Sequence, residues 1–265
     1  MKPPSPETKS TPRRPWHLSA CQSPLCRAFT VALVIGWATL ATRGAESDTG
    51  VAQNQLTDAE SKAGWLLLFD GRTTAGWRSV GKEGFPTQGW AVADGCLKHL
   101  AKGGGGDVIT THQFTDFEFS FDWRLGPGAN SGVKYLLRQG RAGIVGHEYQ
   151  LWDEPNQTVA ARPGKGSTAG FYDVLPPRPH QPLRANGEFN RSRIVVRGEH
   201  VEHWLNDEKV LEYELGSAAV KGSIADSKFK GVSGFGTRTT SPLLLQDHGG
   251  EVWFRNLKLR KLPAG

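Results

Sequence analysis

An unbroken alternation of aromatic and polar residues over positions 117–124 constrains the fold more than any other feature of the sequence. The odd positions are all aromatic and the even positions are all polar: Phe117, Phe119, Phe121 and Trp123 against Glu118, Ser120, Asp122 and Arg124. Successive side chains of a β-strand point to opposite faces, so a period of two predicts a strand. One face of this strand is expected in a core and the other in a polar environment.

Further strand signals recur along the chain, with turn residues between them. Asp94–Gly95 separates two short runs and predicts a hairpin, and residues 191–215 are typical of a three-strand meander with a turn at Asn206–Asp207. Residues 243–250 and 251–262 are expected to form a final pair of strands. Many short strands at this spacing predict an all-β protein, built as a two-sheet sandwich or jelly roll.

Helical signals are weak throughout the sequence. No stretch shows a helical period of twelve residues or more, and one short turn is expected to start at Thr57 or Asp58. We therefore divide the chain into a leader over residues 1–45, a polar lead-in over 46–63 and a single β domain over 64–263.

The leader has the organisation of a signal peptide. Basic residues precede an apolar run from Ala28 to Ala41, and small residues follow up to Ala45. The run is short for a helix that spans a bilayer. We expect cleavage between Ala41 and Glu46, export to the periplasm or the cell exterior, and no integral membrane segment afterwards. A retained N-terminal anchor is the alternative.

Loss of the leader would remove most of the net positive charge, because the net charge would fall from +6 to +1. The leader holds six of the 32 Lys and Arg residues and one of the 26 Asp and Glu residues, which leaves 26 basic and 25 acidic residues. That balance implies no basic surface for nucleic acid. Cys21 and Cys26 also leave, so Cys96 stays alone in a strand-like segment and is expected to be a packed thiol.

A second alternation, over residues 146–152, has an unusual polar face. Tyr149 and Leu151 share one parity, while Glu148 and Gln150 share the other. A carboxylate and an amide on one face of a strand are either solvated or line a site. We interpret this face as part of a sugar-binding groove on one sheet of a jelly roll.

Seven segments together resemble the 3-keto-disaccharide hydrolase family, and they occur in the order that the family has. They span about residues 64 to 262 and read "LLLFDGRTTAGW", "GWAVADGCL", "DFEFSFDWRLGPGANSGVKYLLR", "HEYQLWD", "YDVLPP", "GEFNRSRIVVRGEHVEHWLND" and "LQDHGGEVWFRNLKLRKL". The resemblance implies a concanavalin A-like jelly roll of two antiparallel sheets in a secreted or periplasmic bacterial protein. The sequence departs from the family at Asn206–Asp207, where members usually have Asn-Gly, and at residues 238–245, where members often carry Gly-His-Ile.

The resemblance also implies a lyase or hydrolase that cleaves 3-ketoglycosides. The ketone acidifies the hydrogen on C2, so a base can remove it; an enolate then forms on O3, the C1 substituent leaves, and water can add to the new double bond. This chemistry needs a base, a cation or hydrogen-bond donors for the enolate, and an acid for the leaving group. No redox cofactor is required, a divalent cation is possible, and a separate glycoside 3-dehydrogenase would supply the ketone.

Two residues are candidates for the acid–base roles. Glu148 lies in a segment that matches the family closely. His203 alternates with Val201 and Leu205, and could act as a base or a donor. A histidine on the buried face of a meander is more often packed and hydrogen-bonded.

The candidates for substrate binding are polar or aromatic residues of the same segments: Arg124, Asn130, Lys134, Gln150, Trp152, Asp153, Gln246, Asp247 and His248. Alternatives remain for several of them. Arg124 could instead pair with Asp122 or Glu118, and Asp153 could cap a turn. Asp247 and His248 could brace a loop or hold a structural cation.

Other functions were weighed against this one. No His-Glu-x-x-His spacing indicates a metal centre, so a metal site stays undetermined. A laminarinase-type glycosidase would need a second carboxylate where Gln150 stands. A non-catalytic carbohydrate-binding, lectin-like module has the same fold and the same aromatic residues, and is the main alternative to an enzyme.

Overall fold

The structure is a computed structural model that describes residues 53–140, 143–153, 164–185 and 187–265. They belong to one compact unit, Asp48–Gly265. Residues 1–45, for which we predict a signal peptide, lie outside the described residues. Among the described residues, no helix combines the length and the apolar character needed to cross a membrane.

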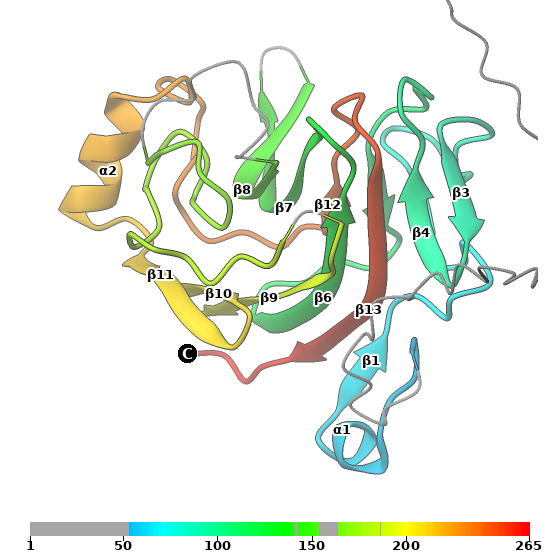
Figure 1. The fold of residues 1–265 in the computed structure, drawn as a ribbon. Helices are drawn as coiled ribbons and strands as arrows, with labels where there is room; N and C mark the ends of the chain where they lie inside the picture. The colour runs from blue at the N-terminus through cyan, green and yellow to red at the C-terminus, as the bar shows by residue number, and fades with distance from the viewer. Residues whose placement is uncertain (1–52, 141–142, 154–163, 186) are drawn as a thin grey trace, which may run out of the picture. The chain divides into compact units, whose positions relative to one another are not determined.

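The described strands form two antiparallel sheets, which confirms the predicted jelly roll (Figure 1). The larger sheet has the order β11-β10-β9-β6-β13-β4-β3, with β1 paired to β13. Its strands are β1 (Trp65–Leu67), β3 (Trp90–Ala93), β4 (Cys96–His99), β6 (Phe117–Leu125), β9 (Asn190–Arg197), β10 (His200–Leu205), β11 (Glu208–Glu214) and β13 (Val252–Lys261). The smaller sheet has the order β2-β5-β12-β7-β8. Its strands are β2 (Trp77–Ser79), β5 (Val108–Thr110), β7 (Asn130–Gly140), β8 (Gly143–Trp152) and β12 (Leu244–Leu245).

Strand β6 has the two faces that the alternation predicts. Its four aromatic side chains are almost completely buried in the core between the sheets. On the other face Glu118 pairs with Arg193 and Arg260, and Asp122 pairs with arginines of β9 and β13. The polar face of β6 is therefore an ion-pair surface on the outside of the larger sheet.

The hairpin and the meander are also confirmed. Strands β3 and β4 pair antiparallel around Asp94–Gly95, and β9, β10 and β11 form consecutive antiparallel pairs. Asn206 and Asp207 both have positive φ, of 45° and 68°. Such a turn suits Asn and Asp, which tolerate the left-handed region, so the departure from Asn-Gly leaves the turn intact. Cys96 is buried, as expected for a packed thiol.

The predicted final strand pair is wrong. Strand β12 lies between β5 and β7 of the smaller sheet, whereas β13 lies between β4 and β6 of the larger sheet. Residues 246–251 therefore cross from one sheet to the other instead of closing a hairpin. Side chains in this crossover do not follow strand alternation, so neighbours there can share one site.

Two short helices complete the described fold. Helix α1 (Asp58–Lys62) begins after Thr57, where Thr57 and Glu60 form a reciprocal capping box, and confirms the predicted turn. Helix α2 (Ala218–Ala225) was not predicted. Its eight residues bury only Val220, which leaves too little apolar pattern to detect in the sequence.

Candidate active site

The polar face of β8 points away from the larger sheet. Its neighbour Tyr149 points into the core, where its hydroxyl donates to the carbonyl of Trp204 at 3.0 Å and lies 2.7 Å from Ser192 Oγ. Because alternate side chains of a strand point to opposite faces, Glu148 and Gln150 lie on the outer face of the smaller sheet.

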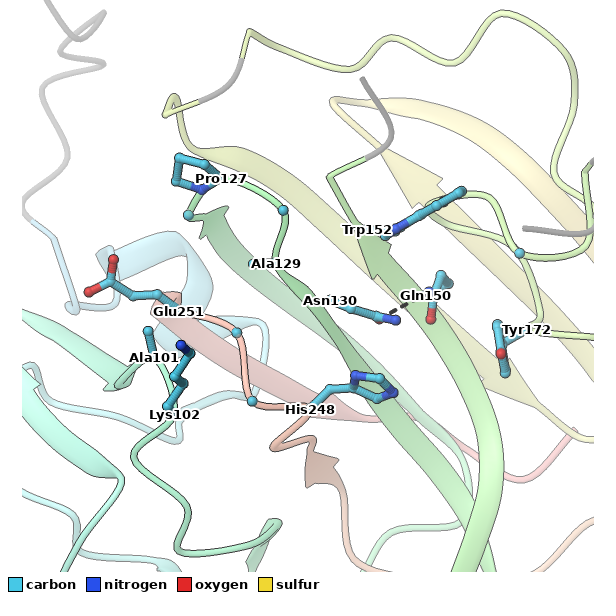
Figure 2. Close-up of a pocket in the computed structure, with 15 residues that line it drawn as sticks. Ala101, Lys102, Pro127, Ala129, Asn130, Gln150, Trp152, Tyr172, His248 and Glu251 are labelled. Atoms are coloured by element: carbon cyan, nitrogen blue, oxygen red, sulfur yellow. Dashed lines mark hydrogen bonds between the residues drawn. The ribbon is translucent and has the colours of Figure 1, made fainter. Parts of the chain in front are cut away.

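Two connected cavities lie on this face. One is an outer cleft of about 710 Å³, bordered by Trp152 and by residues 126–129 and 248–251 (Figure 2). The other is an inner pocket of about 120 Å³ around Glu148. Both are lined by Asn130, Gln150, Tyr172 and His248, so the inner pocket opens into the outer cleft. The outer cleft has the size usual for small-molecule sites.

A buried carboxyl group shares the inner pocket with two lysines. Glu148 is 5% exposed, its Oε2 lies 3.8 Å from Lys134 Nζ, and Lys228 lines the same pocket. Burial raises the pKa of Glu148 above its usual value, and the positive charges of Lys134 and Lys228 oppose part of that rise. A carboxyl with a raised pKa can take up a proton more readily than an exposed one.

A second carboxylate, that of Asp107, also lies near Lys134. Asp107 Oδ2 lies 3.9 Å from Lys134 Nζ, and Asp107 Oδ1 accepts a hydrogen bond from the backbone of Asp247. Burial raises the pKa of Asp107, against the attraction of Lys134. Lys134 is thus shared between two carboxylates instead of neutralising one.

Lys228 is held by aromatic rings. Its Nζ lies 4.1 Å from the centroid of the Tyr172 ring and 5.1 Å from that of Phe229. Burial lowers the pKa of Lys228, and the nearby Glu148 charge offsets part of that lowering. The inner pocket therefore presents a partly desolvated ammonium group beside the carboxyl group.

Glu148 has room only because residue 132 of the adjacent strand is glycine. A Cβ at Gly132 would lie 2.7 Å from Glu148 Oε1 and 2.8 Å from its Cγ. Real Cβ atoms are not found that close to other heavy atoms, so any larger residue would displace the carboxylate.

Two amide oxygens remain available to a ligand. Gln150 Nε2 donates to Asn130 Oδ1 at 3.1 Å, which orients the Gln150 amide (Figure 2). The side-chain oxygens of Gln150 and Gln246 are buried and accept no hydrogen bond from the described residues. Both residues line the inner pocket. Buried acceptors of this kind are suited to hydroxyl donors, of which a sugar has several.

The structure brings together seven of the eleven predicted site residues. Those that line the inner pocket or the outer cleft are Glu148, Asn130, Lys134, Gln150, Trp152, Gln246 and His248. They come from β7, β8 and the crossover after β12. The other four lie elsewhere.

His203 lies in the core, on the opposite side of β8 from Glu148. Its Nδ1–H donates to the carbonyl of Ala169 at 2.8 Å, so its Nε2 accepts from the Tyr135 hydroxyl at 2.6 Å. Tyr135 in turn accepts from Tyr213, which accepts from His147 Nδ1, both at 2.8 Å. The structure therefore separates His203 from Glu148, and shows the packed, hydrogen-bonded histidine that was the alternative to a catalytic role.

Arg124 lies on the outer face of the larger sheet and not in either cavity, which corrects its predicted place in the site. Its guanidinium stacks over Trp253, 4.2 Å from the ring centroid, and over Phe189 at 4.9 Å. The physical reason is strand parity: with Trp123 buried in the core, the next side chain must point outward.

Asp153 and Asp247 brace loops at the edge of the cleft. Asp153 Oδ2 accepts from the backbone of Gly128 at 2.7 Å, and so holds the Gly-Pro-Gly turn. Asp247 accepts from the backbones of Gly106 and Gly249, and its Oδ1 lies 2.9 Å from His99 Nε2. For these two residues the structure shows the bracing alternative.

Sequence reasoning missed three residues that form the inner pocket or hold it. Tyr172 lies in "YDVLPP", one of the segments that resemble the family, but nothing in that segment predicts a role for the tyrosine. Asp107 directly precedes β5, and Lys228 lies in an irregular segment after α2. No periodicity marks either position, because only the folded chain brings them beside β7 and β8.

The described residues contain one group of three side chains with metal-ligating atoms in reach of one another. His200, Glu202 and Glu212 place such atoms within 4.8 Å, on strands β10 and β11. Lys209 already pairs with both glutamates there. These strands belong to the larger sheet, away from the inner pocket and the outer cleft.

Comparison with known proteins gives consistent results. The family model described as a 3-keto-alpha-glucoside-1,2-lyase-like domain matches residues 64–260. A curated protein of Bacteroides thetaiotaomicron, named 3-keto-disaccharide hydrolase, is 34% identical over 230 residues, which cover 75% of this chain and 79% of the relative.

Two solved structures from Parabacteroides distasonis, both provisionally named glycosyl hydrolases, share the fold. One superposes with a TM-score of 0.70 at 29% identity, covering 80% of this chain and all of the other. The second has a TM-score of 0.57 at 22% identity, covering 75% of this chain and 99% of the other.

Proposed function

The chain belongs to the family of 3-keto-alpha-glucoside-1,2-lyase-like domains, and from this membership and its cleft we propose that it cleaves 3-ketoglycosides by elimination at C1 and C2. The curated relative is named as a hydrolase of 3-keto-disaccharides, which supports a substrate with a glycosidic bond. Elimination followed by addition of water gives the same net products as hydrolysis.

One observation carries the proposal: a buried carboxyl group shares a pocket with two lysine side chains at the inner end of the cleft. Glu148 lies 3.8 Å from Lys134 and shares its pocket with Lys228. This combination suits enolate formation next to a ketone, because it supplies a base for the C2 proton and positive charge for the oxygen that becomes negative.

In the first step Glu148 takes the proton from C2 of the bound ketone. The electron pair of the C2–H bond forms the C2–C3 double bond, and the C3 carbonyl oxygen becomes an enolate. Lys134 and Lys228 stabilise that oxygen by charge and hydrogen bonding. Gln150 and Gln246 accept hydrogen bonds from sugar hydroxyls and so hold the ring in place.

In the second step the enolate restores the ketone, a C1–C2 double bond forms, and the C1–O bond breaks. The leaving oxygen takes a proton from a donor where the inner pocket meets the outer cleft, and His248 and Tyr172 both line that position. Water then adds to C1 and gives one proton to the donor that was deprotonated when the alcohol left, while protonated Glu148 returns its proton to C2. The products are a 3-keto sugar and an alcohol.

Export and supply of the substrate complete the proposal. We propose that residues 1–45 direct the chain to the periplasm or the cell exterior, and that a separate glycoside 3-dehydrogenase forms the ketone. The proposed step consumes no redox equivalent and needs no nucleotide cofactor. A divalent cation could still assist at the enolate oxygen, and activity after chelation would test this.

The test is turnover of methyl 3-keto-glucosides of both anomeric configurations in deuterated buffer. We expect release of methanol and a 3-keto sugar that carries deuterium at C2, because the proton on Glu148 exchanges with solvent before it returns. Direct hydrolysis at C1 would leave C2 unlabelled beyond the rate at which the free 3-keto sugar exchanges.

The same experiment separates the enzyme from a lectin-like module. Saturable binding of the keto-glucoside without release of methanol, and without exchange at C2, would establish a binding protein and refute the proposed reaction.

A further inference from the structure

We propose that the outer cleft is the subsite for the leaving group and that it selects leaving groups with a flat, mainly apolar ring, such as an aromatic aglycone, through stacking on Trp152. The inference depends on the proposed function, because it presumes that the keto sugar reacts beside Glu148. It adds the direction in which the substrate lies and the chemical class of the group that departs.

The direction follows from how the two cavities join. The reacting atoms C2 and O3 must lie at Glu148 and the lysines, in the small inner pocket. The group on C1 must then extend through the junction formed by Asn130, Gln150, Tyr172 and His248. Beyond that junction lies the cleft of about 710 Å³, which is the larger of the two cavities.

The lining of the outer cleft indicates the class of ligand. Beyond the junction its lining is glycine, alanine and proline, apart from three larger side chains: Lys102, Trp152 and Glu251. The carboxylate of Glu251 is already paired with Lys98. A second sugar would find few side-chain partners for its hydroxyls there, whereas an aromatic ring needs none.

The backbone of Trp152 is held in place before any ligand arrives. Thr168 Oγ1 accepts from the Trp152 backbone N–H at 3.0 Å and donates to its carbonyl at 2.9 Å. The side chain is half-buried at the end of β8 and borders the cleft opposite Ala101, Lys102 and Glu251 (Figure 2). An aromatic side chain on a fixed backbone loses little conformational entropy when a ring stacks on it.

The experiment compares 3-keto-glucosides that share one keto sugar and one anomeric configuration but differ in the leaving group. Methanol, 2-phenylethanol and a glucose unit serve as the three leaving groups, and the two alcohols have similar acidity, so their comparison isolates binding. We expect the wild type to prefer the phenylethyl over the methyl substrate by about tenfold or more in kcat/KM, the scale of ring stacking together with burial of the ring.

Two variants locate this preference. Trp152→Ala should reduce the phenylethyl-to-methyl ratio to within about twofold of unity, because kcat/KM falls much more on the phenylethyl substrate than on the methyl substrate. Ala101→Trp, at an exposed turn position, should fill the cleft and have the same effect without touching β8. Trp253→Ala, on the larger sheet, is the matched tryptophan control and should leave the ratio unchanged.

Several results would overturn the subsite. One is a wild-type ratio of kcat/KM for the phenylethyl and methyl substrates near one. Another is an equal loss of kcat/KM on both substrates in Trp152→Ala. A third is a glucose leaving group that the wild type prefers over phenylethanol and that loses this preference in Trp152→Ala. If none of the three substrates is turned over, the proposed function has failed. In that case the dissociation constants of the phenylethyl and methyl compounds test the subsite. Binding of the phenylethyl compound about tenfold more tightly than the methyl compound would support it, and equal binding would overturn it.

Discussion

Strand β8 separates two buried polar regions that differ in almost every respect. On its outer face Glu148 lies with Lys134 and Lys228, in a pocket that opens to a cleft. On its inner face His147 begins a chain of hydrogen bonds that ends at His203. The first region holds charges and has unused acceptors; the second is a directed chain of neutral groups.

The difference shows how burial can serve either chemistry or stability. In the core, burial lowers the pKa of His147 to about 3 and that of His203 to about 4, so both rings stay neutral and the hydrogen-bond directions are fixed. In the pocket, burial raises the pKa of Glu148, but neighbouring lysines keep a charged form accessible. Changes to the pocket should affect catalysis, and changes to the core network should affect folding.

The strongest test of this division is Glu148→Gln. The variant keeps the shape of the side chain but cannot accept the C2 proton, so we expect kcat to fall by roughly 10²- to 10⁴-fold on a methyl 3-keto-glucoside. Urea denaturation should give a free energy of unfolding within about 1 kcal/mol of wild type. Full activity in Glu148→Gln would refute the proposed base.

The hydrogen-bonded chain from His147 to His203 in the core should make the free energy of unfolding depend on pH in the acid range. The folded-state pKa values of about 4 for His203 and about 3 for His147 lie below the unfolded value of about 6.5. As pH falls, the unfolded chain takes up protons first. The contribution of the two neutral histidines to the free energy of unfolding is therefore fully present above about pH 6.5, and it declines as pH falls toward 4. From pH 8 to pH 5 we expect a loss of about 2 kcal/mol per histidine, measured by urea denaturation.

His203→Gln is the matched variant for that experiment. It should be less stable than wild type at pH 8 but lose about 2 kcal/mol less between pH 8 and pH 5. Its kcat at pH 8 should stay within about threefold of wild type. A variant that folds normally yet is inactive would instead return His203 to the catalytic mechanism.

A smaller effect, on the pH dependence of kcat/KM, is expected when Asp107, the second carboxylate that pairs with Lys134, is replaced. In Asp107→Asn a negative charge leaves the neighbourhood of Glu148, and Lys134 can pair with Glu148 alone. The pKa of Glu148 should fall, and the acid limb of the kcat/KM profile should move to lower pH by up to about one unit. Asp94→Asn, at the exposed β3–β4 turn, is the control. A limb that does not move, or moves upward, would show that Asp107 has no electrostatic effect on the base.

The smallest effect is expected for Arg124→Ala. The side chain stacks on the outer face of the larger sheet, so kcat/KM should stay within about twofold of wild type. A tenfold rise in KM would place Arg124 with the substrate and contradict its observed position.

The sequence predicted the strands better than it predicted the site. The parity of β6 and β8 follows from local alternation, and it correctly separated Phe119 from Glu118 and Tyr149 from Glu148. The alternation of side chains shows which residues share a face of a strand, but it does not show which of the two faces borders a cavity. Arg124 and Lys134 therefore looked equivalent in the sequence, although only Lys134 lies in the pocket.

The residues that were missed depend on contacts between distant segments. Asp107 and Lys228 come from parts of the chain distant from the predicted Lys134, and no local pattern predicts that they meet it. The crossover between β12 and β13 was mistaken for a hairpin, because a change of sheet leaves no mark in the spacing of two apolar runs.

Gly132 gives the proposed chemistry a genetic consequence. Every glycine codon becomes an alanine codon through one base change, and the added methyl group would occupy the space that Glu148 needs. Gly132 faces outward from β7, so the core between the sheets would be left untouched. Under the proposed mechanism, one point mutation would separate a working enzyme from a folded protein that keeps its outer cleft but lacks a correctly placed base.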